Sequence, residues 1–391
     1  MNTVKSFIEV DYHQIQKSGQ NIAGDVFLSR KIDGGNHVVS VLADGLGSGV
    51  EACVLASLTA QMAIEYVIGN IATEKAARIV MDALPICKDR KISYSTFTIV
   101  DTDVRGATRI IEHGNPRFIL LRNGESVPIE RSVVSEPRWN GRSLAYSEFD
   151  VTFGDRIVLF SDGVSQSGIG TKEYPLGWGM DMTTRAVLEY TRRREDISAR
   201  NLSRNITNRA LRNDGGRAGD DITCGVIYFR RPRRMLVLTG PPYDGEKDRE
   251  CALLLDGYDG HRVICGGTTA NIVARELDRS VSMDLGTIDP EIPTTSRMEG
   301  VDLVTEGCLT LGKCAEILES GIVPQGDNGA IQLVNMLLQS DIIQFVVGTR
   351  VNEAHQNPNL PVELDIRRNV VKKIVGLLEE KYLKECHIEY V

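Results

Sequence analysis

The chain has 391 residues, more than one domain ordinarily contains, so its length predicts two domains. It carries 45 basic and 53 acidic residues, and this net charge of −8 argues against a general nucleic-acid-binding protein. Hydrophobic residues at 42% and charged residues at 25% are ordinary for a soluble globular protein, and no membrane partner is expected. Eight cysteines without a Cys-x-x-Cys pair favour free thiols in a reducing cytoplasm.

The first half of the chain is predicted to be rich in strands. Two helices follow each other at 48–69 and 73–88, and two more are expected at 181–195 and 197–213. Many antiparallel strands with grouped helices predict an α+β sandwich. The extended segments are 6–15, 24–33, 36–45, 94–103, 108–115, 117–124, 143–153, 155–163 and 221–229.

The helix at 48–69 has two features of its own. Ser48 and Glu51 have the spacing of a capping box, in which each side chain accepts from a free backbone N–H. Four apolar residues at four-residue spacing predict the buried face of this helix: Val54, Leu58, Met62 and Tyr66.

The charged segment Arg230–Arg234, which contains Pro232, predicts a domain boundary. We therefore expect domains at 1–232 and 233–391. Beyond the boundary, short apolar runs that end near glycines alternate with helical segments, which predicts a smaller α/β domain with a mostly parallel sheet. Its strands are expected at 234–240, 261–267, 301–307 and 342–349, and its helices at 246–256, 269–278, 309–319, 328–340 and 365–384.

Acidic residues stand at the ends of four predicted strands. Asp44 and Asp162 each follow an apolar run and precede a glycine, and Asp25 and the pair Asp220-Asp221 stand at strand starts. A lone Asp-Gly usually marks a hairpin turn, but the sequence after Asp44 predicts a helix rather than a second strand. We expect these carboxylates to converge at one end of the sandwich.

Carboxylates that lie together repel one another unless a cation compensates their charge. Oxygen ligands without cysteine or clustered histidine select Mg²⁺ or Mn²⁺. The glycine after Asp44 lets the carbonyl of Gly45 come close to such an ion. Two ions a few ångströms apart can bind a phosphate and activate a water for its hydrolysis.

Five segments in order, "AGDVF", "VLADGLGSGVEA", "EHGNPRFILLRNG", "GDRIVLFSDGV" and "GDDITCGVIYF", resemble the motifs of the metal-dependent Ser/Thr phosphatases, the PPM family. They are most similar to its bacterial branch, the phosphatases that resemble stage II sporulation protein E (SpoIIE). The resemblance covers about residues 5–230. It implies a PPM-type β-sandwich flanked by helices and hydrolysis of phosphoserine or phosphothreonine by a water that two metal ions activate. The implied substrate is a phosphorylated protein such as an anti-sigma-factor antagonist.

The resemblance also implies a role for each acid. Asp44 would bridge both metals and Gly45 would offer its carbonyl, while Asp162 and Asp220 would hold the first metal. Asp25 would hold the second metal through water. Asp221 would recruit a third ion or orient Asp220. The residues implied in catalysis are Asp44, Asp162 and Asp220, and the metal ligands are Asp25, Asp44, Gly45, Asp162, Asp220 and Asp221.

The sequence departs from the family at several points. Leu46 stands where many eukaryotic members carry a histidine proposed as general acid, and Lys17 is the nearest cation to Asp25. His113 is expected to be structural rather than catalytic, and Asp155 is expected to cap a turn rather than bind metal. An alternative is a catalytically weak or inactive PPM-fold module that a ligand of the second domain controls.

The second domain matches no family motif, and we expect a regulatory or ligand-binding role. Gly266–Thr269 joins a predicted strand to a helix, where backbone N–H groups could bind a small anion. Tight strand–helix turns would explain the same glycines. A homodimer is also left open.

Overall fold

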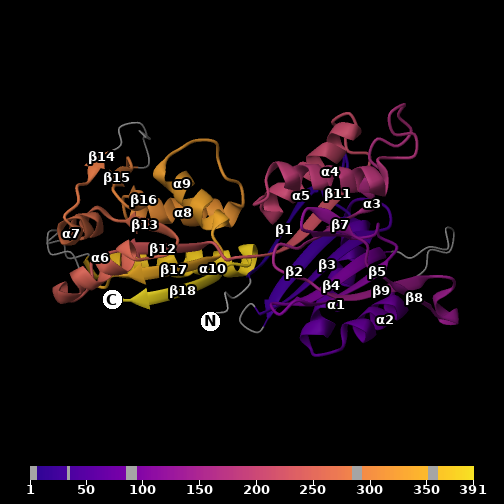
Figure 1. Cartoon of the computed structure of the whole chain (residues 1–391), viewed down its shortest axis with the longest axis horizontal. Coiled ribbons are helices and arrows are strands. Elements are labelled where there is room, and N and C mark those ends of the chain that lie inside the picture. Colours follow the sequence, from indigo (N-terminus) through magenta and orange to yellow (C-terminus); the bar gives the residue numbers. More distant parts are fainter. Residues whose placement is uncertain (1–6, 33–35, 85–94, 284–292, 351–359) are drawn as a thin grey trace. The chain divides into compact units, whose positions relative to one another are not determined.

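The computed structural model describes residues 7–32, 36–84, 95–283, 293–350 and 360–391, with side chains from Ile366 onward in the last of these stretches. The chain divides into two compact units, Met1–Arg231 and Pro232–Val391, which Figure 1 shows in indigo to magenta and in orange to yellow. The division falls inside the segment Arg230–Arg234.

Two antiparallel sheets form the core of the first unit. One contains, in spatial order, β1 (Phe7–Ile15), β11 (Ile222–Arg230), β10 (Arg156–Phe160), β6 (Ile119–Arg122) and β7 (Glu125–Val127). The other contains β2 (Asp25–Ile32), β3 (His37–Gly45), β4 (Ser95–Asp103), β5 (Ala107–His113), β9 (Ser143–Asp150) and β8 (Ser132–Ser135).

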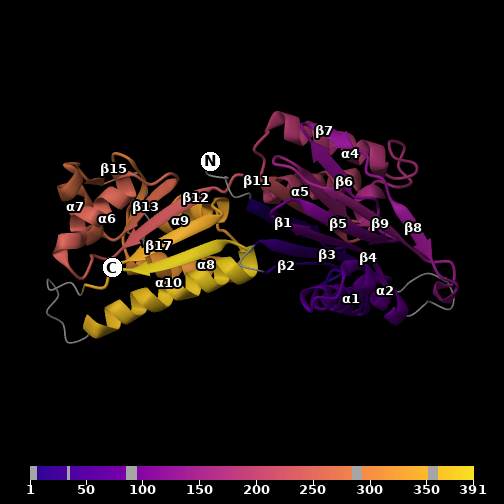
Figure 2. The same cartoon turned by 60° about the horizontal axis from the view of Figure 1, so that its bottom comes forward.

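Helices cover the outer faces of this sandwich. α1 (Val50–Ile68) and α2 (Thr73–Ala83) pack on the sheet that contains β3, and α4 (Gly179–Arg193) and α5 (Ala199–Asn213) pack on the other, as Figures 1 and 2 show. The one-turn α3 (Asp162–Ser165) follows β10. The α+β sandwich is thus confirmed. The helix predicted at 73–88 ends at Ala83, and residues 85–88 lie outside the described residues.

The buried face of α1 differs from the predicted one. Val54 and Leu58 are 50% and 56% exposed, so the predicted apolar face was wrong at these two positions, whereas Met62 and Tyr66 are partly buried against the core. Small residues form the buried face instead: Ala52, Ala56, Ala60 and Ala63. They let the helix lie very close to β3, because a Cβ on Gly45 would collide with the Ala52 carbonyl.

The predicted capping box was also wrong. The residue before the first turn of α1 is Gly49, with φ 76°, and no side chain caps the helix. The left-handed conformation at Gly49 gives the chain its sharp entry into α1. On length and composition alone, α1 passes as a membrane span among the described residues. Its alanine face nevertheless packs in the protein core, as in the core helix of a globular domain.

The second unit is built on one mixed sheet. Its helices α6 (Asp248–Asp256) and α7 (Gly267–Leu277) cover one face, and α8 (Cys308–Ser320), α9 (Gly329–Gln339) and α10 (Leu360–Tyr382) cover the other. Figure 2 shows α10 running along β17 and β18. The spatial order of the strands is β14 (Ser282–Met283), β15 (Ser296–Met298), β16 (Val301–Thr305), β13 (His261–Cys265), β12 (Arg234–Thr239), β17 (Ile342–Val347) and β18 (Glu385–Tyr390).

The five strands from β16 to β18 are parallel, which confirms the predicted sheet type. The sequence did not reveal the two short antiparallel edge strands or β18. β18 is partly exposed and carries charged residues, so it lacks the continuous apolar run of a central parallel strand.

Candidate metal centre

The antiparallel registers place the predicted acids at the same edge of the sandwich. Asp25 opens β2 and lies directly opposite Asp44, near the end of β3. In the other sheet, Asp162 follows β10, and Asp221 precedes β11, the neighbour of β10. Ser161 joins these two ends, because its N–H donates to the Thr223 carbonyl at 3.0 Å and its hydroxyl to the Asp221 carbonyl at 3.3 Å.

Hydrogen bonds then link the two sheets. The Thr223 hydroxyl on β11 donates to Asp25 Oδ2 on β2 at 2.7 Å. Gln14 on β1 donates from Nε2 to the Asp25 carbonyl at 2.9 Å and to the Thr223 hydroxyl at 3.0 Å. Asp25 is therefore fixed by residues from two strands of the other sheet, and its side chain is held at the junction of the sheets.

The carboxylates at this edge lie close enough to perturb one another. Burial raises the pKa of Asp44 to about 9, helped by the negative charges of Asp25, Asp162, Asp220 and Asp221. Burial likewise raises the pKa of Asp25 to about 7, with Asp221 and Asp162 adding to the shift. The pKa of Asp162 is also raised, by burial and then by Asp220. This edge thus holds more negative charge than the protein alone stabilises.

The donor set fits a hard divalent cation, since it consists of carboxylate oxygens whose repulsion a cation would relieve. Within the described ranges, no three Asp, Glu, His or Cys side chains are arranged to hold a metal ion as they stand. Burial and neighbouring negative charge raise the pKa of both Asp44 and Asp162, so ion binding at this edge would be coupled to the release of protons.

Asp221 and Gly45 have additional structural tasks. The two oxygens of Asp221 accept from the backbone N–H groups of Lys17 at 2.9 Å and Gly24 at 2.8 Å, so this carboxylate fixes the loop that leads into β2. Gly45 donates its own N–H to the Gly24 carbonyl at 3.2 Å. Its missing side chain admits α1, as described above, which is a packing reason for the glycine that the sequence did not reveal.

Two further polar side chains reach the acids. Lys17 Nζ lies 3.4 Å from Asp220 Oδ1, and Gln166 Nε2 donates to Asp162 Oδ2 at 2.9 Å. Lys17 was named from the sequence only as the nearest cation, and Gln166 was missed. Its position, one helical turn after Asp162, was the available signal, because residues four apart lie on the same helix face. Ser161 and Thr223 also escaped notice, although they flank the acidic motifs.

His113 and Asp155 have the structural roles that were expected. His113 Nδ1 lies 2.9 Å from the Ser143 carbonyl, and burial lowers the pKa of the imidazole. Asp155 accepts from Arg122 Nη2 at 2.6 Å and from the Thr152 N–H at 2.8 Å. The carboxylate therefore closes the turn before β10.

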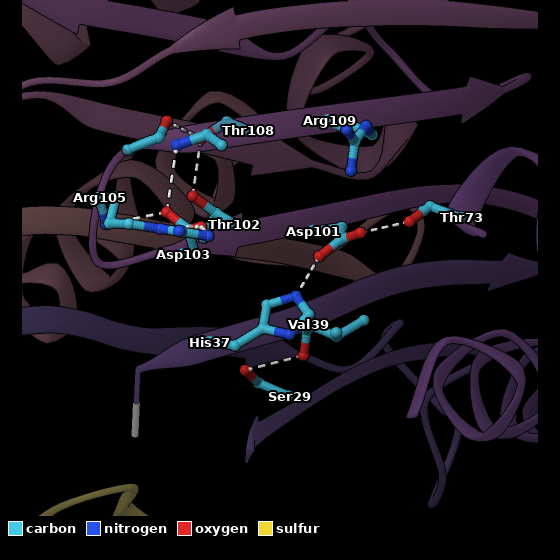
Figure 3. A network of polar contacts seen from close by, with 12 residues as sticks. Ser29, His37, Val39, Thr73, Asp101, Thr102, Asp103, Arg105, Thr108 and Arg109 are labelled. Atoms are coloured by element: carbon cyan, nitrogen blue, oxygen red, sulfur yellow. Dashed lines mark hydrogen bonds and ion pairs between the residues drawn. The ribbon is translucent and has the colours of Figure 1, made fainter. Parts of the chain in front are cut away.

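A cavity of about 450 Å³ lies at the opposite end of β3 from Asp44, around His37. There His37 and the Thr73 hydroxyl both hydrogen-bond to the buried carboxylate of Asp101, and Figure 3 shows all three. Burial opposes ionisation of Asp101, but these hydrogen bonds outweigh it and lower its pKa. Thr73 is the first residue of α2, so this network ties that helix to the sheet. The cavity is separate from the acidic edge.

The raised pKa of Asp44 predicts a pH dependence of the metal-free protein. Between the unfolded pKa near 3.8 and the folded pKa of about 9, the folded state retains a proton that the unfolded state releases. The free energy of unfolding should therefore fall as pH rises from 5.5 to 8.5. Asp44→Asn removes this ionisation. As pH rises, the free energy of unfolding of the variant should therefore increase relative to that of the parent by up to about 1.4 kcal/mol per pH unit.

Urea unfolding in EDTA at several pH values measures the difference in the free energy of unfolding between the parent and Asp44→Asn. Asp181→Asn, at an exposed position on α4, is the matched control and should keep a constant offset from the parent. An equally constant offset for Asp44→Asn would show that Asp44 is ionised in the metal-free fold.

Several solved structures resemble this chain at low sequence identity. The fold search finds the phosphatase domain of SpoIIE from Bacillus subtilis (14% identity, TM-score 0.43, 59% of this chain and 95% of that chain). It also finds the RsbU and RsbW domains of a Mycobacterium tuberculosis protein (16%, 0.47, 64% and 68%) and RsbX in complex with magnesium (19%, 0.40, 57% and 95%).

No curated protein sequence matches the chain. The family model described as "Stage II sporulation protein E (SpoIIE)" matches residues 34–230, about half of the chain. The matched segment contains Asp44, Asp162, Asp220 and Asp221, and Asp25 lies just before it. The chain therefore belongs to the SpoIIE family of PPM-type phosphatases.

Proposed function

We propose that the first unit is a metal-dependent phosphatase that hydrolyses phosphoserine or phosphothreonine on a protein. The observation that carries the proposal is the meeting of Asp25, Asp44, Asp162 and Asp220 at one edge, where burial and the neighbouring negative charges raise the pKa of Asp25, Asp44 and Asp162. A cluster of carboxylates with few cations around it does not stabilise a fold, whereas a site for divalent cations needs such a cluster. Membership in the SpoIIE family supports the same assignment.

Each acid has a task in the proposed site. Asp44 lies opposite Asp25 in its own sheet, and the charge of Asp162 in the other sheet acts on it, so it would serve as a ligand common to two Mn²⁺ or Mg²⁺ ions. Asp162 and Asp220 would hold one ion, and Asp25 the other. Bound ions of this kind neutralise a phosphate and lower the pKa of the attacking water.

The remaining side chains hold and orient these ligands. Thr223 and Gln14 fix Asp25, Asp221 fixes the preceding loop, and Gln166 orients the carboxylate of Asp162. Lys17 Nζ, beside Asp220, is the cation best placed to contact a substrate phosphate.

In this proposal neither of the two family positions considered, 46 and 113, supplies an imidazole to protonate the leaving group. Position 46 is a leucine, and the His113 ring is committed to the Ser143 carbonyl. Water then has to supply the leaving-group proton. A substrate with a good leaving group, such as p-nitrophenyl phosphate, should consequently react faster than phosphoserine.

The proposed substrate is a phosphorylated regulatory protein in bacterial signalling, similar to an anti-sigma-factor antagonist. Support comes from the family to which the chain belongs. The exposed Val50 and Val54 of α1, which begins five residues after Gly45, offer an apolar surface to a protein substrate.

Purified full-length protein should hydrolyse p-nitrophenyl phosphate in the presence of Mn²⁺ at a rate at least about 100-fold above an EDTA control. Phosphoserine and phosphothreonine peptides should be dephosphorylated under the same conditions. Turnover no faster than the EDTA control on all these substrates would contradict the enzyme assignment. If Mn²⁺ still bound, that result would favour a PPM-fold binding module.

A further inference from the structure

The second unit has a strand order with a chain reversal. In chain order its five parallel strands are β12, β13, β16, β17 and β18, and in space they run β16, β13, β12, β17, β18. The chain thus builds the sheet outward from β12 on one side and then returns to add β17 on the other. Open α/β sheets bind ligands outside the carboxyl ends of their strands at such a reversal, which here lies between β12 and β17.

Glycines occupy both strand ends at this point. Gly240 follows β12 with φ 81°, and Gly348 follows β17. A Cβ on Gly348 would collide with the carbonyls of Gly240 and Pro241. The two loops therefore touch through bare backbone, because no side chain stands between them.

Arg367 of α10 brings a cation to these strand ends. It precedes the buried residues Val371, Ile374 and Leu378 at helical spacing, so it lies on the face of α10 that packs on the sheet. A Cβ on Gly240 would lie 2.5 Å from Arg367 Nη1. Within the described part of the chain, this half-buried guanidinium has neither a hydrogen-bond partner nor an ion-pair partner.

Thr239, the last residue of β12, provides a second unpaired group. The residue is 0% exposed, and its hydroxyl has no hydrogen-bond partner among the described residues. Met235 and Val237 of the same strand pack in the core under α8 and α10, and the two-residue period places Thr239 on that face as well. The Thr239 hydroxyl and the Arg367 guanidinium, both without a described hydrogen-bond partner, thus lie on the same side of the sheet at the end of β12. Both would be satisfied by an anion that accepts hydrogen bonds.

The other candidate positions along this edge are weaker. Glu306 caps the N-terminus of α8, since its Oε2 accepts from the Leu309 N–H at 3.2 Å. Gly266–Thr269 opens α7 without a side-chain cap, and the Thr269 hydroxyl is buried without a described partner. That loop follows β13, however, which is not at the reversal.

We propose that the second unit binds a small phosphate-bearing molecule at the carboxyl ends of β12 and β17. The Arg367 guanidinium contacts the phosphate, and the Thr239 hydroxyl donates a further hydrogen bond. Phosphate suits this pair because its several oxygens accept from the planar guanidinium fork and from a hydroxyl together. Arg350 follows β17 and can add a second guanidinium charge, since its backbone N–H holds it beside the end of β12 by donating to the Pro241 carbonyl at 3.2 Å. This site goes beyond the proposed phosphatase activity and does not depend on it.

Isothermal titration calorimetry on the full chain in EDTA tests the site with pyrophosphate, AMP and ATP as probes. EDTA keeps divalent ions from recruiting phosphate to the acidic edge, and Asp44→Asn should bind the probes like the parent. Arg367→Gln should weaken binding at least about tenfold, and Thr239→Val about threefold. Lys372→Gln removes a charge from the exposed face of the same helix, and its affinity for the probes should stay within about twofold of that of the parent.

Comparison of the probes identifies the source of the phosphate. Tighter binding of AMP than of pyrophosphate means that a nucleoside contributes, and equal binding means that the phosphate alone is recognised. The proposal is overturned if no probe binds at millimolar concentration, or if Arg367→Gln and Lys372→Gln have equal effects. It is also overturned if Thr269→Val weakens binding while Arg367→Gln does not, since the site would then lie at α7. Thermal unfolding confirms that each variant is folded.

Discussion

An Asp44→Asn variant is expected to lose Mn²⁺-dependent phosphatase activity by at least about 100-fold. Asp44 lies opposite Asp25 in the sheet register, and the charges of Asp25, Asp162, Asp220 and Asp221 all act on its carboxylate. Replacing it with an amide removes one negative charge from the proposed bridge between two ions. The change in shape is minimal, so the fold should persist, and the metal-free variant should be at least as stable as the parent near pH 8.

Steady-state hydrolysis of p-nitrophenyl phosphate over a range of Mn²⁺ concentrations measures this effect. The loss should persist at saturating Mn²⁺, because the bridge is absent rather than merely weakened. Parent-like kcat and Mn²⁺ dependence in Asp44→Asn would show that Asp44 does not bridge the ions. Asp181→Asn, which removes a carboxylate from the surface of α4, is the control and should retain full activity.

Asp155→Ala should have the opposite pattern, with a large loss of stability and little loss of metal dependence. The Asp155 side chain is 1% exposed and accepts from Arg122 Nε and Nη2 and from the N–H and hydroxyl of Thr152. Its removal should cost about 3 kcal/mol, a value below that of a fully buried pair because Arg122 is partly solvated. The transition of the first unit should fall by about 6 to 12 °C.

Differential scanning calorimetry on the full chain measures the shift. Asp150→Asn, five residues earlier at an exposed position, is the matched control and should change the transition by no more than about 2 °C. An Asp155→Ala protein with unchanged melting but lost Mn²⁺ dependence would place Asp155 among the metal ligands and contradict the turn assignment.

The sequence predicted the acidic edge because strand ends are easy to recognise. Asp44 and Asp162 each terminate an apolar run before a glycine, and such ends must lie at the rim of a sheet. The antiparallel pairing of Asp25 with Asp44 follows once their two strands are neighbours. The residues that connect the sheets, Gln14 and Thr223, were not predictable, because their contacts depend on how two separate sheets face each other.

The face of α1 was misjudged for a different reason. The sequence from 50 to 68 carries apolar residues on several sides, so periodicity alone did not identify the buried one. The larger residues Val54 and Leu58 were favoured because they would bury more area. The fold instead buries the alanines, since Gly45 on β3 and Gly24 just before β2 allow a close approach that only small side chains fit. The glycines Gly24 and Gly45, together with the alanines of α1, would have indicated this close packing.

In the second unit, the alternation of strands and helices predicted the parallel sheet, but not its strand order. The reversal arises because the chain adds β13 and β16 on one side of β12 and then adds β17 on the other side. Nothing in the local sequence encodes the side on which β17 pairs. The expected anion site at Gly266–Thr269 therefore rested on glycine placement alone. The positions of Arg367 and Thr239 became apparent only once α10 was seen to lie over the end of β12.

Direct measurement of Mn²⁺ binding tests the central claim, that the acids at the ends of β2, β3, β10 and β11 form a metal centre. Titration of the metal-free full chain, followed by electron paramagnetic resonance of free Mn²⁺, should give about two ions per chain for the parent. Asp44→Asn should bind neither ion at the same concentrations, and Asp181→Asn should bind both. A parent protein that binds no Mn²⁺, or an Asp44→Asn protein that binds it like the parent, would contradict the assignment of these carboxylates.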